Sequence, residues 1–264
     1  CFFQYKAHSP KSFSLHIKED LFDFDNYDPI KKFCCWETVL LSLLEFKNYH
    51  IHDNNIIEIK LEENYINTLF KNILKKLKIV FQEEALFTSH NKNIHKYSFD
   101  SSFVRENILK NLSIPEKKCC KQNWLRTAFL CCGYIGNPEK NYHLEFTTSS
   151  LENINKIKNI LNKDGLTSKV YKKNIESENY VLYIKKSDDI IYFLGLIGAN
   201  KYLLEIENLK ITKEIKNKVM RQLNYEMANV EKTSNAAAKQ INAIDWAVKT
   251  GFFNDLPESL KEVA

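Results

Sequence analysis

The sequence predicts an α+β protein made of a duplicated unit, with helices and antiparallel sheets in each copy. A pair of adjacent cysteines opens an apolar helical run twice along the chain, and a similar order of strand and helix patterns follows each time. Only 6 Gly and 5 Pro occur in 264 residues, so long regular elements should dominate over loops. The hydrophobic share of 44% and charged share of 27% are typical of a globular protein with a sizeable core.

The first copy begins with Lys31-Lys32-Phe33-Cys34-Cys35-Trp36 and an apolar run that reaches Phe46. Alternating apolar residues on either side of an Asp-Asn-Asn turn predict two short strands, and apolar residues at helical spacing predict the next helix. In order, the expected elements are strands at Tyr49–Asp53 and Ile56–Leu61, a helix over Tyr65–Leu77, strands at Ile79–Phe81 and His95–Phe99, and a helix from about Ser102 to Leu112.

The second copy begins with Lys117-Lys118-Cys119-Cys120, three residues farther from its apolar run, Ala128–Tyr134. Ser149 or Ser150 can cap a helix, and Asp164-Gly165 can end it. In order, the expected elements are a strand at Tyr142–Thr147, a helix over Ser150–Asn162, strands at Ser168–Lys173 and Tyr180–Lys185, and a helix over Ser187–Leu196. The two opening runs can bury each other. Two unrelated α+β domains are the alternative, but the shared cysteine-pair start favours duplication.

The charge and hydropathy of the chain indicate its cellular compartment and the kinds of partner it can bind. The net charge of +5 permits binding to nucleic acid without requiring it. The longest apolar run, Val39–Leu44, is interrupted by Ser42 and is far too short to span a membrane. The first residues, Cys1-Phe2-Phe3-Gln4, lack the pattern of a secretory signal. We therefore expect a cytoplasmic protein with no membrane partner.

Six of the seven cysteines form adjacent pairs: Cys34-Cys35, Cys119-Cys120 and Cys131-Cys132. Neighbouring cysteines rarely form a disulfide with each other, and zinc ligands usually have two to four residues between them. No pair has that spacing by itself. We therefore expect buried, reduced thiols, with no metal site and no cofactor.

The order helix, two strands, helix, two strands, helix, given twice with the opening helices packed together, resembles the LAGLIDADG homing endonucleases. On that signature, Leu40–Asn48 reads LLSLLEFKN and Ala128–Gly136 reads AFLCCGYIG. The resemblance implies an acid at the eighth position of each, where it holds the catalytic divalent metal through hard oxygen ligands. This chain has Lys47 and Ile135 there. A lysine repels the metal and an isoleucine cannot bind it, so we expect no catalytic residues.

Motifs farther along the chain resemble the WhiA family of sporulation and cell-division regulators. The resemblance covers about Phe13 to Ala264 and is strongest after Leu125. The most specific stretch is Asn224-Tyr225-Glu226-Met227-Ala228-Asn229-Val230-Glu231-Lys232-Thr233. Further matching segments are Arg126-Thr127-Ala128-Phe129-Leu130, Tyr142-His143-Leu144-Glu145-Phe146, Tyr183-Ile184-Lys185-Lys186-Ser187, Ile197-Gly198-Ala199, Asn217-Lys218-Val219-Met220-Arg221 and Leu256-Pro257-Glu258-Ser259-Leu260.

The family resemblance implies a degenerate endonuclease-like domain, a helical linker and a C-terminal helix-turn-helix domain. We expect the last domain to be truncated, with only its first helix present and its DNA-recognition helix missing. The expected divisions are a disordered leader at 1–11, the first LAGLIDADG-like repeat at 12–115, the second at 116–200, the helical linker at 201–253, and the first helix of the truncated helix-turn-helix domain at 254–264.

Three lysines on one predicted strand and one on the next form a basic cluster: Lys169, Lys172, Lys173 and Lys185, with Lys186 beside them. In active homing endonucleases the sheet face straddles DNA, so these lysines are candidate phosphate contacts. The alternative is a solvated strand edge protected by lysines. That alternative is favoured, because alternation along the strand sends Lys169 and Tyr171 to one face and Lys172 to the other.

Two basic residues of the predicted linker, Arg221 and Lys232, are also candidate DNA contacts. Side-chain contacts that tie linker helices together are the favoured alternative for both, because Arg221 lies at helical spacing from Asn217 and Asn224. His143 and Glu145 share one face of their strand and could form an acid–base pair. A structural hydrogen bond is the preferred interpretation, since no nucleophile lies near them in the sequence.

These features favour a non-enzymatic transcriptional regulator that binds double-stranded DNA, mainly through the C-terminal domain expected to be missing. The resemblance implies roles in cell division, chromosome segregation and, in spore-formers, sporulation, with a nucleoid-associated location and a possible regulatory protein partner. One alternative is a residual metal-dependent endonuclease that uses Glu45, but helical rotation should turn this side chain away from the central site. The other is a protein-interaction scaffold.

Overall fold

The computed structural model describes residues 12–22, 30, 32–87, 93–102, 104, 115–173 and 178–262. The chain divides into one compact unit that ends at Glu207 and a second that starts at Asn208. The leader expected at 1–11 lies outside the described residues, as does most of the helix expected at Ser102–Leu112. Within the described ranges, no helix has both the length and the apolarity needed to cross a bilayer.

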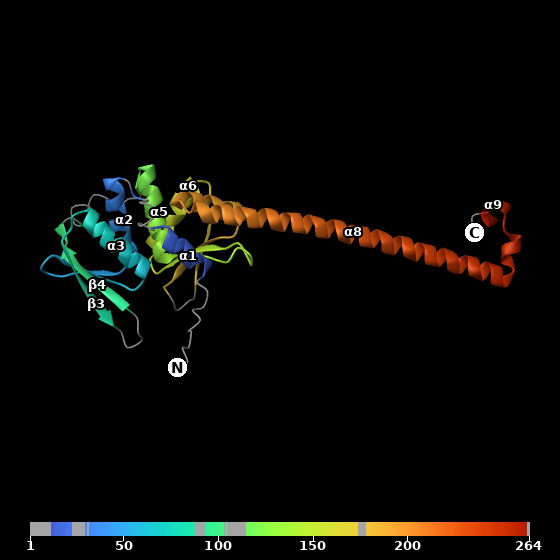
Figure 1. Cartoon of the computed structure of the whole chain (residues 1–264), viewed down its shortest axis with the longest axis horizontal. Coiled ribbons are helices and arrows are strands. Elements are labelled where there is room, and N and C mark those ends of the chain that lie inside the picture. The colour runs from blue at the N-terminus through green and yellow to red at the C-terminus, as the bar shows by residue number, and fades with distance from the viewer. Residues whose placement is uncertain are drawn as a thin grey trace, which may run out of the picture. The chain divides into compact units, whose positions relative to one another are not determined.

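The first copy of the duplicated unit forms a four-stranded antiparallel sheet covered by helices (Figure 1). The strands lie in the order β1-β2-β4-β3. Among the described residues, α2 and α3 accompany this sheet, and they are preceded in the chain by α1, a helix that was not expected from the sequence. The elements are α1 (Phe13–Asp20), α2 (Phe33–Phe46), β1 (Tyr49–Ile51), β2 (Ile56–Leu61), α3 (Asn64–Lys76), β3 (Phe81–Phe87) and β4 (Asn93–Asp100).

The second copy repeats this topology, with strands in the order β5-β6-β8-β7. Because the same strand order follows each opening helix, the predicted duplicated α+β fold is confirmed. The elements are α5 (Lys118–Cys132), β5 (Gly133–Ile135), β6 (Leu144–Thr148), α6 (Leu151–Lys163), β7 (Lys169–Lys172), β8 (Tyr180–Ile184) and α7 (Ser187–Ile197). Ser150 caps α6 by accepting a hydrogen bond from the backbone of Asn153, as its position before the helix predicts.

The strand expected at Ile79–Phe81 begins later than predicted. Lys78 has a left-handed backbone with φ of 57°, and the backbone N–H of Ile79 bonds to the carbonyl of Leu74. This turn closes the end of α3. The chain therefore leaves the helix through Ile79 and Val80, and β3 starts only at Phe81.

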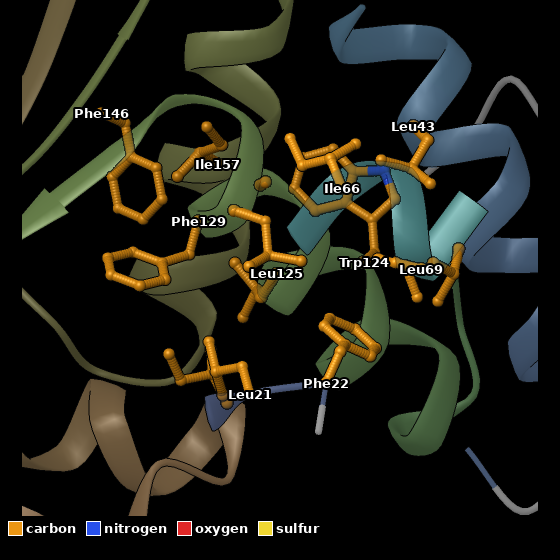
Figure 2. Packing of buried hydrophobic residues seen from close by; sticks show 14 of the residues in the cluster. Leu21, Phe22, Leu43, Ile66, Leu69, Trp124, Leu125, Phe129, Phe146 and Ile157 are labelled. Carbon is orange, nitrogen blue, oxygen red and sulfur yellow. The ribbon is translucent and has the colours of Figure 1, made fainter. Parts of the chain in front are cut away.

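The core forms where the opening helices α2 and α5 pack together. Leu40 and Leu43 of α2, and Leu125 and Phe129 of α5, are completely buried. Figure 2 shows residues of both copies in this single cluster, including Leu43, Ile66 and Leu69 of the first copy and Trp124, Phe129 and Phe146 of the second. Burying each such side chain contributes about 1.5–3 kcal/mol. The shared core therefore holds the two copies together.

The second unit consists mainly of one long helix. α8 runs without interruption over Asn200–Thr250, which includes almost all of the linker expected at 201–253. Gly251 ends it with φ of 76°, a conformation that favours glycine. The 3₁₀ helix η1 (Phe252–Asp255) and α9 (Glu258–Lys261) follow. Most side chains of α8 after Asn208 are exposed.

Candidate nucleic-acid interface

The helix α2 ends at Lys47, the eighth position of the LAGLIDADG-like signature. Lys47 is the C-cap residue of α2, and its backbone N–H bonds to the carbonyl of Leu43. Its Nζ atom donates a hydrogen bond of 2.8 Å to Glu63 Oε1. Burial alone would raise the pKa of Glu63, but the hydrogen bond and charge of Lys47 hold that pKa below its usual value. The Glu63 carboxylate at this site is therefore already paired with a cation.

A second cation reaches the same place from α1. Lys18 lies within electrostatic range of Lys47, Glu63, Cys131 and Cys132, and its Nζ atom lies 5.7 Å from the centre of the Phe129 ring. Burial lowers the pKa of Lys18. Burial also raises the pKa of the Cys131 thiol to about 12, so this sulfur is a neutral thiol near pH 7. Two ammonium groups and a neutral thiol make a poor site for a divalent metal.

The corresponding end of the second helix differs from the prediction. Ile135 was expected at the end of the opening helix, but α5 ends at Cys132 and Ile135 lies in β5. Gly133 is the C-cap residue and so matches Lys47 by position. The helix α5 thus stops two residues earlier than the LAGLIDADG-like signature predicts.

Gly133 leaves no room for a side chain. A Cβ atom built there would lie 2.3 Å from Phe129 Cδ2 and 2.7 Å from the Phe129 carbonyl oxygen. Because one of these contacts is with backbone, rotation of the phenylalanine ring cannot relieve both. An aspartate at Gly133 is therefore sterically excluded, and this end of α5 provides no carboxylate.

Glu45, the alternative catalytic acid, points elsewhere and has partners on the second copy. Its Oε1 accepts a hydrogen bond of 2.8 Å from Lys156, and its Oε2 accepts one of 3.1 Å from Trp124 Nε1. The Glu45 carbonyl accepts a further bond from Asn153. These contacts give Glu45 a structural role, which agrees with the rotation expected along the helix.

The helix α1 lies along the outer edge of β5. This strand is an edge strand, and Ser14 Oγ accepts a 3.2 Å hydrogen bond from its Ile135 N–H. Ser14 and Ile17 are buried, while Asp20 accepts a 2.6 Å bond from Tyr202. One feature of the sequence marks the start of α1. Ser12 precedes an amphipathic stretch and accepts a hydrogen bond from Leu15 N–H, as an N-cap does.

The sheet of the second copy has an apolar inner face and a basic, aromatic outer face. Strand register places Tyr134, Glu145, Tyr183 and Lys169 in one row across the four strands. The flanking row has Leu144 paired with Ile184, both buried, so it belongs to the inner face. The outer row therefore carries polar and aromatic groups that remain accessible.

The predicted basic residues divide between the two faces. Lys169 and Tyr171 lie on the outer face, with the two rings of Tyr171 and Tyr183 5.7 Å apart. Lys185 Nζ lies 5.4 Å from the Tyr183 ring centre, which places it on the same face. Lys172 pairs with Tyr180 in the opposite register, so it is on the other face, as alternation predicts. Lys173 follows the end of β7, and its N–H bonds to the carbonyl of Asn179.

His143 and Glu145 lie together on this outer face. Their Nε2 and Oε2 atoms are 2.9 Å apart, and the His143 ring stacks on Tyr183 at 6.2 Å between centres. The histidine is thus held by an acid and an aromatic ring. The contact agrees with a structural hydrogen bond, the interpretation that the sequence favoured.

The equivalent face of the first copy has paired charges. Glu58 lies 3.0 Å from Lys96, 3.7 Å from Lys60 and 3.3 Å from His52. Lys96 also lies 3.8 Å from Glu84. Lys60 and Lys96 of this sheet are therefore neutralised by neighbouring carboxylates, whereas no ion pair of Lys169 or Lys185 is found among the described side chains.

Arg221 and Lys232, the predicted basic residues of the linker, are both exposed on α8. Arg221 Nε donates a hydrogen bond of 3.2 Å to the backbone carbonyl of Asn217 in its own helix. The sequence favoured contacts between separate linker helices, but this stretch is one continuous helix. Arg221 therefore bonds within its own helix, and both side chains remain accessible.

The fold and the ends of its two opening helices define a LAGLIDADG-like protein whose central position holds a lysine–glutamate pair. Residues 121–216 match the WhiA LAGLIDADG-like domain, and residues 219–264 match the WhiA C-terminal HTH domain. A probable cell division protein WhiA of Ruminiclostridium cellulolyticum is 32% identical over 272 residues, which cover 96% of this chain and 85% of that protein. The chain belongs to the WhiA family.

Solved structures agree with this assignment. The crystal structure of full-length DUF199/WhiA from Thermatoga maritima matches with a TM-score of 0.69 and 25% sequence identity. The match covers 96% of this chain and 85% of that one. The N-terminal LAGLIDADG domain of DUF199/WhiA gives a TM-score of 0.59 at 22% identity, over 74% of this chain and 97% of that one. The second of these supports the fold alone.

The HTH match corrects one prediction. The helix-turn-helix domain was expected to be largely missing, with only residues 254–264 belonging to it, but the match begins at residue 219, inside α8. The boundary was misplaced because α8 is continuous from Asn200 to Thr250 and has no internal cap or turn to mark where the linker stops.

Proposed function

We propose that this chain is a DNA-binding regulator that acts in cell division and does not cleave DNA. Its membership of the WhiA family and the HTH match over residues 219–264 support the binding role. The relative from Ruminiclostridium cellulolyticum is described as a probable cell division protein. We extend the proposal to transcription regulation, chromosome segregation and, in spore-formers, sporulation, in the cytoplasm at the nucleoid.

The observation that carries the non-cleaving part is the chemistry at the ends of α2 and α5. Metal-dependent cleavage needs carboxylates free to hold a hard cation beside the scissile phosphate. Glu63 is paired with Lys47 at 2.8 Å, Lys18 adds a second positive charge, and Gly133 has no space for an acid. A net positive site of this kind suits a phosphate group better than a divalent metal ion.

We infer that two separate regions contact DNA: the region that matches the HTH domain, and the outer face of the second sheet. On that face Lys169 and Lys185 supply positive charge beside Tyr171 and Tyr183. Homing endonucleases, which this domain resembles, place DNA across these sheet faces. Because the lysines of the first sheet already pair with Glu58 and Glu84, we assign the phosphate contacts to the second sheet.

Removing the two outer-face lysines should weaken DNA binding and reduce its dependence on salt. We expect the Lys169→Ala/Lys185→Ala variant to lower the slope of log K against log salt by about 1–2, since each phosphate contact contributes about 0.9. The measurement is fluorescence anisotropy with a duplex across a salt titration. The Lys172→Ala variant is the matched control, because it removes a lysine from the same strand but from the opposite face.

Two outcomes would contradict the proposal. Equal loss of affinity in Lys172→Ala and Lys169→Ala would show that overall charge matters and that the outer face does not. Nicking of supercoiled plasmid by the wild-type protein in Mg²⁺ or Mn²⁺, abolished by Glu45→Ala, would show an active nuclease site.

A further inference from the structure

Four cysteines from different parts of the chain meet at the N-terminal ends of the two opening helices. Cys34 and Cys35 lie in the first turn of α2, and Cys119 and Cys120 lie in the first turn of α5. All four sulfur atoms lie within 4.8 Å of one another. Cys119 Sγ is 4.0 Å from Cys120 Sγ, and Cys120 Sγ is 3.6 Å from the Cys34 carbonyl oxygen. The cluster could not be recognised in the sequence, because a whole repeat separates the two cysteine pairs.

The size of the cluster fits a single metal ion. A tetrahedral zinc ion with Zn–S bonds of about 2.3 Å places its sulfurs about 3.8 Å apart. The present separations reach 4.8 Å at most, so each sulfur needs to move by only a fraction of an ångström or a modest side-chain rotation. An iron–sulfur cluster spreads its thiolates farther, because inorganic sulfides lie between the irons. Hard cations such as Mg²⁺ require oxygen ligands, which this group of side chains does not offer.

The surroundings supply the positive charge that four thiolates and one divalent ion need. Each cysteine pair lies at a helix N-terminus, where the helix dipole and free backbone N–H groups stabilise anions. Neither α2 nor α5 has a side chain that caps this end. Lys32, Lys117 and Lys118 immediately precede or flank the two pairs. A tetrathiolate centre with a net charge of −2 is therefore compensated locally.

Burial of part of the cluster suits a structural ion. Cys35 and Cys120 are 2% and 5% exposed, whereas Cys34 and Cys119 are half-buried. Two ligands thus lie inside the shared core, and two lie where an ion can enter. Four ligands leave no open position for a substrate or water, which is typical of structural zinc sites.

We propose that Cys34, Cys35, Cys119 and Cys120 bind one Zn²⁺ ion, which joins the two repeats at the N-terminal ends of α2 and α5. The ion lies at the opposite end of these helices from Lys47 and Gly133, so the site is separate from the lysine–glutamate pair at the helix C-terminal ends. Binding the ion requires the four thiols to release their protons to solvent, with no change in oxidation state.

The test begins with the full chain purified under reducing conditions and then supplied with Zn²⁺ or Co²⁺ alone. We expect one Zn²⁺ per chain by elemental analysis, and a Co²⁺ spectrum with thiolate charge-transfer bands and the strong visible bands of a tetrahedral site. Zn²⁺ should also raise the Tm by about 5–15 °C, because the ion binds only the folded state. Removing the ion with a chelator should reverse this rise.

Matched variants separate this site from other thiols. Cys34→Ser/Cys119→Ser replaces the two half-buried ligands and is expected to lower Zn²⁺ affinity by more than about 100-fold. Cys131→Ser/Cys132→Ser removes the same number of half-buried thiols from the other end of α5 and should bind one Zn²⁺ as the wild type does. Circular dichroism of each variant without metal checks that it is folded.

Three results would overturn the proposal. The first is a wild-type protein that stays metal-free with four reduced thiols in the presence of Zn²⁺. The second is equal loss of zinc from both double variants. The third is an intramolecular disulfide between the two pairs, found by mass spectrometry of protein prepared in reductant and unaffected by Zn²⁺.

Discussion

At the scale of single residues, the ends of the two opening helices differ in their chemistry. Lys47 places a cation at the end of α2, where Glu63 holds it. Gly133 removes the side chain altogether and lets the chain pass close to Phe129. The identity of Lys47 could be predicted from the sequence. The role of Gly133 could not, because it depends on where α5 stops, and the apolar run continues past that point.

Replacing Gly133 by alanine should destabilise the protein by about 1–3 kcal/mol, since the added methyl group overpacks the turn against the backbone of Phe129. Urea unfolding followed by circular dichroism measures the change. Gly195→Ala is a suitable control, because this glycine lies in α7 and its new methyl group would meet only the flexible end of Leu203. A loss below about 0.5 kcal/mol in Gly133→Ala would contradict the steric argument.

The Lys47–Glu63 pair should contribute stability that depends on pH. The pKa of Glu63 is lower in the folded state than its ordinary value of 4.5. The contribution is therefore present above pH 4.5 and disappears as the pH falls through the folded-state pKa. Because the carboxylate is partly exposed, we expect Glu63→Gln to cost about 0.5–1 kcal/mol at pH 7.

This difference between Glu63→Gln and the wild type should vanish in acid, as measured by thermal unfolding between pH 7 and pH 3. Glu152→Gln removes an exposed carboxylate that also pairs with a lysine, Lys156. It should leave the unfolding curve at pH 7 unchanged. A pH-independent loss in Glu63→Gln would instead indicate a packing effect.

At the scale of elements, periodicity predicted most helices and strands but missed α1. The helix has only 8 residues, and its burial depends on contacts with β5 and with Tyr202 that are distant in the sequence. The lysine that it brings to the central position, Lys18, was missed for the same reason. Short helices of this kind are held by tertiary contacts, so their local pattern is weak.

Ser14→Ala should expose the role of α1 at the edge of the second sheet. The variant removes the acceptor for the buried N–H of Ile135, which should cost about 1–3 kcal/mol and accelerate hydrogen exchange at that amide. Ser12→Ala weakens the N-cap of α1 but keeps the acceptor in place, so exchange at Ile135 should change less. Equal exchange rates in Ser14→Ala and the wild type would mean that another group satisfies this amide.

At the scale of the whole chain, the sequence predicted the duplicated fold and its shared core, because the two cysteine-pair starts mark the repeat. The opening helices were expected to pack together, but the sequence did not predict that the two cysteine pairs meet, since that requires knowing that α2 and α5 begin at the same end. It also misplaced the start of the HTH region, because helical periodicity alone does not divide a continuous helix such as α8 into domains.

The first unit should fold without the second. Every residue of the large hydrophobic cluster precedes Glu207. A chain that ends at Glu207 should therefore keep a cooperative thermal transition within about 3 °C of the full chain, while losing most of its affinity for DNA together with the region matching the HTH domain. Calorimetry and anisotropy measure the two effects. A broad or absent transition in the shortened chain would show that the core needs the second unit.

The outer faces of the two sheets differ, and this difference has a consequence for the DNA site that the proposed function implies. A dimer of identical subunits presents the same groups twice and so favours palindromic sites. Here one polypeptide carries both sheets, and their outer faces differ in charge. The first sheet has Glu58 paired with lysines. The second sheet has Lys169 and Lys185 beside tyrosines. Two unlike faces do not require a palindromic DNA sequence. For the proposed DNA binding, we therefore expect an asymmetric DNA site that the protein binds in one preferred orientation.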